Sequence, residues 1–161
     1  RVVGADISEN MLAVAREKAR EKGLEDRLEF RYGDSENLDF EDGTFDAVTV
    51  AFGVRNFEHL ERGLAEMCRV LRPGGKVVVL EFSTPERFPM KQLYRFYFKQ
   101  ILPRVGGFVS GDRKAYEYLP ASVFAFPQGD RFLQIMRSCG YRNVAQRRLT
   151  FGIASLYTGE K

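Results

Sequence analysis

The chain has 161 residues, of which 44% are hydrophobic and 29% charged, so its length and composition predict one globular domain with one core. No apolar run is long enough for a membrane span and the first residues lack the pattern of a secretory signal, so we expect a cytoplasmic protein. Two distant cysteines, Cys68 and Cys139, and a single histidine exclude a disulfide framework and a zinc site, and we expect both cysteines in the core and no metal.

The net charge of +3 is distributed unevenly. Between residues 82 and 126 there are seven lysines or arginines against three acids, and the same segment holds 11 of the 21 aromatic residues. Such a composition is typical of a nucleic-acid surface, a membrane-facing surface or a lid over an apolar ligand. A small helical subdomain with an aromatic core is the alternative.

Strand-like and helix-like segments alternate from the first residue, which is the pattern of a mostly parallel sheet flanked by helices. Residues 1–6 indicate a short buried strand. The next segment predicts a helix that Ser8 caps and Gly23 ends. One face of this helix is apolar and consists of Met11, Leu12, Ala15 and Ala19.

The middle of the chain predicts three more strands and one helix. Strands are expected at 27–34 and 44–52, and the second of these is apolar enough to lie in the centre of the sheet. A helix is expected from about residue 59 to residue 71, followed by a turn at "RPGG" and a strand over 76–82.

Five prolines change the pattern after Ser83, so the segment 84–127 is expected to consist of short helices and loops inserted between elements of the sheet. From Gly129 a helix is expected to about Cys139. Two strand-like runs follow, and their close connection predicts an antiparallel hairpin that closes the edge of the sheet.

Acidic side chains follow the first two expected strands. Asp6 lies where a carboxylate in such folds accepts hydrogen bonds from the hydroxyls of an adenosine ribose, although an Asp between a strand and a helix is as often a turn or capping group. Asp34 and Ser35 follow the next strand, where an acceptor can meet an adenine amino group. Because ligands gather beyond the carboxyl ends of strands in these folds, the two positions support each other.

Several long motifs resemble a known family. The stretch "RVLRPGGKVVVLEFS" is similar to the signature of the ubiquinone and menaquinone biosynthesis C-methyltransferases, with Arg72 where a lysine is usual. "FGVRN", "YLPASVFAFPQGDRF" and "LTFGIASLYTG" fit the same family in order and spacing, and "ERFPMKQLY" with "AFPQG" favours its menaquinone branch. The resemblance runs over essentially all 161 residues and corresponds to the C-terminal two thirds or so of such an enzyme, without the strand and glycine-rich cofactor loop that precede them.

The resemblance implies an α/β fold of the Rossmann-like class I type that binds S-adenosylmethionine, truncated at its N-terminus. The single domain would span 1–161, with 84–127 as an inserted substrate or lid segment before the last helix and a β-hairpin at the C-terminus. The implied reaction transfers a methyl group from S-adenosylmethionine to a ring carbon of a prenylated quinol, most closely demethylmenaquinol. No nucleic acid is implied as a partner, and a homo-oligomer is left open.

The resemblance also assigns residues by position. Four of them would hold the cofactor: Asp6 at the ribose, Asp34 and Ser35 at the adenine, and Ala51 at the wall of the site. Arg55 and Asn56 resemble the catalytic pair. A fixed guanidinium can stabilise the phenolate that makes the ring carbon nucleophilic, while a positioned water, amide or carboxylate relays the proton.

Other polar residues have two interpretations each. Glu81 either orients Arg55 or a substrate hydroxyl, or forms a structural ion pair. His59 is either a base or, as is commoner at the start of a helix, a capping or solvent-facing residue. Three tyrosines either line the quinone pocket or belong to the core or an interface: Tyr94, Tyr97 and Tyr116.

A polyprenyl substrate is too apolar to wait in water, so the resemblance favours a lid that contacts the membrane. Aromatic and basic residues of the inserted segment suit an anionic leaflet: Phe96, Phe98, Phe108, Lys91, Arg95 and Lys99. The protein would then be peripheral on the inner face of the cell membrane. Two other functions remain open: a nucleotide-dependent oxidoreductase, for which no nicotinamide site is indicated, and a noncatalytic quinone-binding or assembly module.

Overall fold

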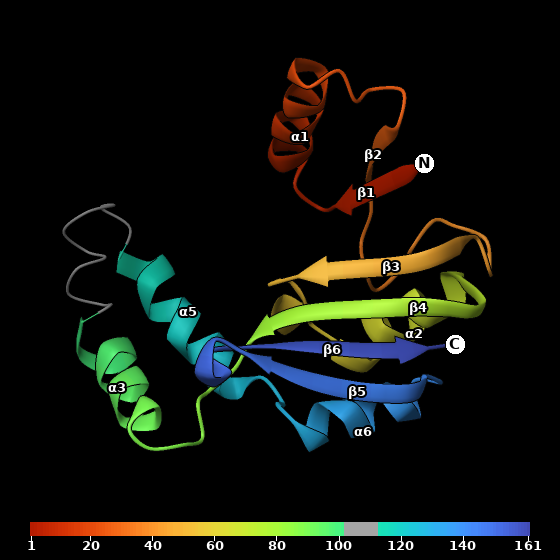
Figure 1. Cartoon of the computed structure of the whole chain (residues 1–161). Helices are drawn as coiled ribbons and strands as arrows, with labels where there is room; N and C mark the ends of the chain where they lie inside the picture. Colours follow the sequence, from red (N-terminus) through yellow and green to blue (C-terminus); the bar gives the residue numbers. More distant parts are fainter. Residues whose placement is uncertain (102–112) are drawn as a thin grey trace.

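The computed structural model describes residues 1–101 and 113–161, with the backbone alone described at residue 99 and over 113–117 (Figure 1). The strands form a parallel pair, β1 with β2, and a four-stranded sheet of the order β3-β4-β6-β5. β3 and β4 are parallel, and β6 is antiparallel to both of its neighbours. The strand bounds are β1 Val2–Asp6, β2 Leu28–Tyr32, β3 Phe45–Ala51, β4 Leu71–Phe82, β5 Arg142–Leu149 and β6 Ala154–Glu160.

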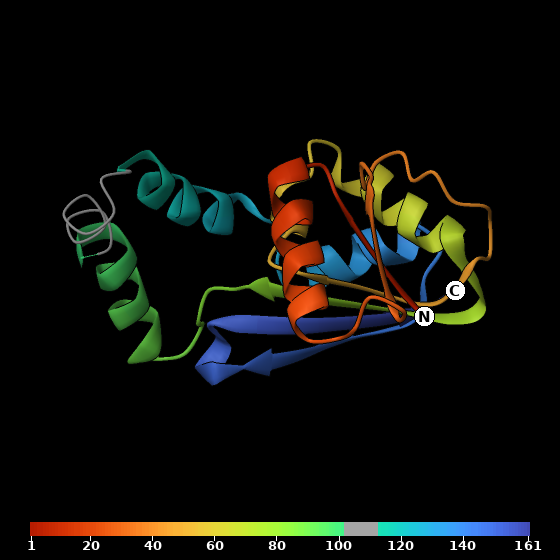
Figure 2. The same ribbon diagram turned by 90° about the horizontal axis from the view of Figure 1, so that it is seen from above.

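Helices cover one face of the four-stranded sheet and extend beyond one end of it. α2 and α6 pack on the sheet, whereas α3, the π-helix η2 and α5 project past the carboxyl ends of β3 and β4 in both views (Figure 1, Figure 2). The arrows of β1, β3 and β4 point the same way in Figure 1, so their carboxyl ends face one side of the molecule. The bounds are α1 Glu9–Glu21, η1 Val54–Asn56, α2 Leu60–Val70, α3 Met90–Phe96, η2 Tyr97–Ile101, α5 Arg113–Ala125, α6 Asp130–Ser138 and η3 Thr150–Gly152.

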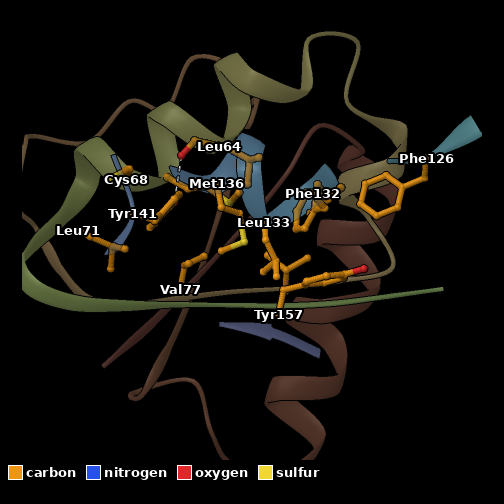
Figure 3. Packing of buried hydrophobic residues seen from close by; sticks show 13 residues of the cluster. Leu64, Cys68, Leu71, Val77, Phe126, Phe132, Leu133, Met136, Tyr141 and Tyr157 are labelled. Carbon is orange, nitrogen blue, oxygen red and sulfur yellow. Dashed lines mark hydrogen bonds between the residues drawn. The ribbon is translucent and has the colours of Figure 1, made fainter. Parts of the chain in front are cut away.

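The core lies between the sheet and the helices α2 and α6 (Figure 3). Alternation along β4 turns Val77 and Val79 inward, where both are fully buried in the same cluster as Leu64 of α2. The hydroxyl of Tyr141 donates to the Leu64 carbonyl oxygen at 3.0 Å, which satisfies the polar end of an otherwise buried ring. The same alternation places Glu81 at an inward position and carries its carboxylate into the interior.

Most of the predicted elements are confirmed. Ser8 is the N-cap of α1 and accepts a hydrogen bond from the backbone N–H of Met11, and Gly23 adopts φ 62° beyond the end of the helix. The inserted segment (84–127) contains short helices, and β5 and β6 form the expected hairpin at the edge of the sheet. Met11 belongs to the apolar face expected for α1 but does not pack in the core, because it is 60% exposed. Leu12 and Ala19 are the buried residues of this helix.

Three further predictions about the strands are wrong. The strand over residues 1–6 was expected to be buried, but Val2 is 61% exposed and Asp6 is exposed, because β1 pairs only with β2 among the described residues. β3 lies at the edge of the four-stranded sheet rather than in its centre, because among the described residues it pairs only with β4, while β1 pairs with β2. "RPGG" does not precede β4 but lies inside it. Gly74 adopts φ 79° there, and the register moves from Phe45 opposite Leu71 to Ala47 opposite Lys76. The positive φ explains why a glycine is needed at this irregularity.

The two cysteines differ in their surroundings. Cys68 is buried, as predicted, whereas Cys139 is only partly buried and its thiol lies 3.4 Å from the Glu61 carbonyl oxygen. Burial raises the pKa of both thiols. Both side chains therefore stay in the thiol form at neutral pH.

Candidate active site

The site is built at the carboxyl ends of β3 and β4, where a tight turn follows Ala51. Phe52 adopts φ 57°, a conformation that is unusual for a bulky side chain, and its N–H donates to the Leu80 carbonyl oxygen at 2.8 Å. The turn lets η1 begin directly above the end of β4. Arg55 of η1 thereby reaches Glu81 of β4, although 26 residues separate them.

Glu81 is fully buried and accepts hydrogen bonds on both carboxylate oxygens. Its Oε1 lies 2.9 Å from Arg55 Nη1 and 2.9 Å from the backbone nitrogen of Phe82, and its Oε2 accepts from the backbone N–H of Arg55 at 3.2 Å. A buried carboxylate is stable only when its charge is paired and its oxygens are satisfied. The pair therefore fixes η1 on β4.

The guanidinium of Arg55 is held on several sides. Besides Glu81, Nη1 donates to the Phe52 carbonyl oxygen, and Nε donates to Ser122 Oγ at 3.3 Å. The guanidinium carbon lies 5.4 Å from the centre of the Phe82 ring. Nη2 has no hydrogen-bond partner among the described residues, so it is the nitrogen that remains for a ligand.

Asn56 follows Arg55 and is exposed. Its Oδ1 accepts a hydrogen bond from the hydroxyl of Tyr118 at 3.0 Å. Tyr118 and Ser122 are functional candidates that the sequence did not reveal. Their spacing of four residues places them on one face of α5, but no pattern in the sequence connects that face with Arg55 and Asn56.

The two expected cofactor acids lie side by side at the ends of β1 and β2. Gly33 donates its N–H to the Asp6 carbonyl oxygen at 3.1 Å, which joins the two strand ends. Each acid uses one oxygen in its own turn: Asp6 Oδ1 accepts from the Ser8 N–H at 2.8 Å, and Asp34 Oδ1 accepts from the Glu36 N–H at 2.8 Å. The second carboxylate oxygen of each has no partner among the described residues. Ser35 is partly buried beside Asp34.

Glu36 connects this region with the start of α2, and the sequence analysis did not single it out. Its carboxylate accepts from the backbone N–H of His59 at 2.7 Å, and its second oxygen lies 2.8 Å from His59 Nδ1. The hydrogen bond from the backbone of His59 is the main reason why the pKa of Glu36 is lowered. His59 is thus the exposed N-cap residue of α2, paired with Glu36. A hollow on the surface is lined by His59, Leu60, Glu61 and Arg62 and contains neither Arg55 nor Asn56.

The tyrosines of the inserted segment differ in exposure. Tyr94 is buried against Phe98, with ring centres 4.2 Å apart; its hydroxyl has no partner among the described residues, and burial raises its pKa to about 12. Tyr97 is 45% exposed. The side chain of Tyr116 lies outside the described residues, as do Phe108 and the side chain of Lys99. Phe98 was expected on the membrane-contacting surface together with Phe96, and this prediction is wrong for Phe98. Its ring is buried by the stacking with Tyr94, whereas Phe96 is exposed.

Comparisons with known proteins agree with the motifs. The model of the ubiE/COQ5 methyltransferase family matches residues 1–161. Demethylmenaquinone methyltransferase of Bacteroides fragilis is 49% identical over 161 residues, which are 100% of this chain and 66% of that protein. Ubiquinone/menaquinone biosynthesis C-methyltransferase UbiE of Geobacter sulfurreducens is 48% identical over 160 residues, which are 99% of this chain and 62% of that protein. The chain thus spans somewhat less than two thirds of the length of these relatives.

Solved structures show the same fold. Phosphoethanolamine N-methyltransferase 2 of Haemonchus contortus, determined in complex with S-adenosyl-L-methionine, superimposes with a TM-score of 0.69 at 15% identity. The match covers 99% of this chain and 43% of that one. At this identity the likeness concerns the fold alone, and it confirms the predicted Rossmann-like class I architecture.

Proposed function

Because the chain belongs to the ubiE/COQ5 methyltransferase family, we propose that it forms the larger part of an S-adenosylmethionine-dependent C-methyltransferase that acts on a prenylated quinol. Demethylmenaquinol is the proposed substrate, since the relative from Bacteroides fragilis is named for it. The observation that carries the proposal is Arg55, a guanidinium held by buried Glu81 at the carboxyl ends of two parallel strands. No observation favours a noncatalytic quinone-binding module.

The cofactor region of the proposal consists of four residues at strand ends: Asp6, Asp34, Ser35 and Ala51. The acids fit the hydroxyls and the amino group of an adenosine, because each keeps a carboxylate oxygen that its own turn does not use. Ala51 is exposed at the end of β3 and has a side chain small enough to leave room for a ligand. S-Adenosylmethionine, when bound, supplies an electrophilic methyl group.

Arg55 and Asn56 are proposed to act on the quinol. Nη2 of Arg55 donates to the quinol oxygen and stabilises the negative charge that develops when the hydroxyl loses its proton, which makes the neighbouring ring carbon nucleophilic. The amide of Asn56 donates to the same oxygen or holds the water that accepts the proton. The inserted segment is proposed to line the quinol on the other side with Tyr94 and Tyr97. Glu81 of β4 is fully buried and both of its oxygens are occupied, so its proposed role is to orient Arg55 and not to contact the substrate.

Methyl transfer by the full-length protein tests this function. S-Adenosylmethionine with a labelled methyl group and demethylmenaquinol should give labelled menaquinol, and Arg55→Ala should lower kcat by roughly 10²- to 10³-fold while the Kd for S-adenosylmethionine changes little. Arg137→Ala removes an exposed arginine of α6 and serves as the matched control. Equal kcat for Arg55→Ala and the wild type would remove Arg55 from the reaction.

Asp6→Asn tests the cofactor region separately. The substitution keeps an acceptor for the Ser8 N–H but removes the charge that is proposed to bind the ribose hydroxyls, so the KM for S-adenosylmethionine should rise with a smaller change in kcat. Ser8→Gly disturbs the same turn without touching the carboxylate and is the control. An unchanged KM for Asp6→Asn would place the ribose elsewhere.

We further propose that α3 and η2 touch the membrane surface. Among the described residues no helix is long and apolar enough to cross a membrane. Leu93, Phe96 and Tyr97 are 56%, 59% and 45% exposed, and Lys91 and Arg95 are exposed beside them. Exposed apolar side chains flanked by cations suit the interface of an anionic bilayer.

Sedimentation with anionic vesicles of the full-length protein tests this contact. Replacing both Lys91 and Arg95 by glutamine should reduce binding. Replacing Lys18 of α1 and its C-cap residue Lys22 by glutamine removes the same charge from another exposed surface and should not. Equal loss in the two double variants would indicate nonspecific charge attraction and contradict the proposed surface.

A further inference from the structure

Both expected catalytic residues contact the inserted segment through one face of α5. Tyr118 donates to Asn56 Oδ1 at 3.0 Å, and Ser122, one helical turn further, accepts from Arg55 Nε at 3.3 Å. Tyr118 is 62 positions from Asn56 in the chain, and Ser122 is 67 positions from Arg55. Two consecutive residues of η1 are therefore matched by two residues on one side of a helix, and neither bond is local in sequence.

The hydrogen bonds determine which way each group points. The hydroxyl of Ser122 donates to the Leu119 carbonyl oxygen at 3.0 Å, so its lone pairs face Arg55. With Nε on Ser122 and Nη1 on Glu81, the plane of the guanidinium is fixed, and Nη2 is the guanidinium nitrogen without a hydrogen-bond partner among the described residues. The phenol of Tyr118 selects the oxygen of the Asn56 amide, which leaves both amide N–H groups to donate elsewhere.

The position of α5 is itself fixed at the base of the inserted segment. Gln128 accepts from the backbone N–H of Thr84 at 2.7 Å and donates to the Val123 carbonyl oxygen at 2.7 Å. Its amide therefore joins the first residue of the segment to the last turn of α5. This clasp brings the end of α5 to the end of β4, from which Tyr118 and Ser122 reach η1.

We propose that Tyr118 and Ser122 are positioning residues of the methyl transfer, which hold Asn56 and Arg55 in the orientation that donates to the quinol oxygen. The assignment rests on the proposed function. Docking of α5 completes the site, because without it the Asn56 amide is free to rotate and one side of the Arg55 guanidinium loses its partner. Substrate contact and orientation of the catalytic pair thus depend on the same helix.

Steady-state kinetics of the full-length protein test the assignment. Tyr118→Phe removes one hydroxyl and should lower kcat roughly tenfold, the effect of one well-formed hydrogen bond, with little change in the KM for S-adenosylmethionine. In an Asn56→Ala background the same substitution should have no further effect. An equal loss in both backgrounds, or an unchanged kcat, would overturn the role of Tyr118.

Ser138→Ala is a closely matched control for Ser122→Ala. Both hydroxyls donate to the carbonyl oxygen three residues earlier in their helix, but Ser138 lies at the end of α6 and its bond is to Ile135, at 2.8 Å. Ser122→Ala should lower kcat several-fold, and Ser138→Ala should leave it unchanged. Equal values for the two variants would overturn the role of Ser122.

Hydrogen exchange separates this inference from the proposed function, because it needs no turnover. The backbone N–H groups of residues 118–125, which exclude Pro120, should exchange faster in Tyr118→Phe and in Ser122→Ala than in the wild type. Unchanged exchange in both variants would overturn the docking of α5 on η1. Absence of methyl transfer by the wild type, by contrast, would refute the quinol reaction. The hydrogen-exchange result would still show whether α5 docks on η1 through Tyr118 and Ser122.

Discussion

The buried pair of Arg55 and Glu81 permits a sharp test of what stabilises the site. Arg55→Met leaves a carboxylate that is fully buried, whereas Glu81→Leu leaves an arginine that is 11% exposed and still donates to Phe52 and Ser122. Breaking a buried pair by removing one partner costs about 3–5 kcal/mol. Because the carboxylate cannot reach water, we expect Arg55→Met near the top of this range and Glu81→Leu below its lower end.

The double variant Arg55→Met/Glu81→Leu should recover most of the lost stability. Replacing a buried ion pair by apolar side chains of similar volume is often neutral or stabilising. Against a total stability of about 5–15 kcal/mol, the single losses are large and the recovery is easily measured. The double variant should nevertheless show the loss of kcat that is proposed for Arg55→Ala, since no guanidinium remains.

Urea unfolding of the full-length protein, followed by circular dichroism, measures these changes as shifts in the midpoint at constant m-value. Arg137→Met is the control for the loss of an exposed arginine. A double variant no more stable than Arg55→Met would show that the desolvated carboxylate is not the source of the loss. Equal stability of Arg55→Met and the wild type would refute the reasoning altogether.

Two other predictions concern the support of α2. A Cβ added at Gly63 would clash with the ring of Phe57, so Gly63→Ala should destabilise the protein by about 1–3 kcal/mol, measured as the urea midpoint, despite the better helix propensity of alanine. The hydrogen bond from Arg69 is the largest cause that lowers the pKa of Glu66, while burial opposes it. Because the folded pKa lies below the unfolded one, Glu66 stabilises the fold above its unfolded pKa of about 4.3, and this contribution is lost as the pH falls through the folded pKa. Glu66→Gln should therefore lower the urea midpoint at pH 7 and leave it nearly unchanged at about pH 2; equal losses at both values would contradict the charge-based explanation.

The fold was largely predictable because its elements are local and their patterns are strong. Ser8 and Gly23 delimit α1 through capping chemistry, and alternation along β4 predicts which of its residues face inward. The central position expected for β3 was wrong, because an apolar run does not reveal how many neighbours a strand has. Pairing depends on the rest of the sheet, and that information is not contained in the strand.

The candidate site was predictable only in part. Arg55 and Glu81 could be proposed as partners, since each stands at the end of an expected strand and parallel strands end on the same side. Tyr118 and Ser122 could not, because the separation in sequence is long and nothing local specifies the face of α5 that meets η1. Contacts of this kind depend on how the inserted segment folds back.

The hydrogen bonds of Gln128 to Thr84 and to Val123 of α5 hold the two ends of the inserted segment together. The position of α5 at the site should therefore depend little on how long the segment is. One side-chain amide joins the two bases of the segment, so the chain between them is closed at its stem. The entropy of closing a loop grows only slowly with its length. A change in the length of the chain between Thr84 and Gln128 should therefore alter the cost of closing this stem only slightly, so the α5 face should stay on η1.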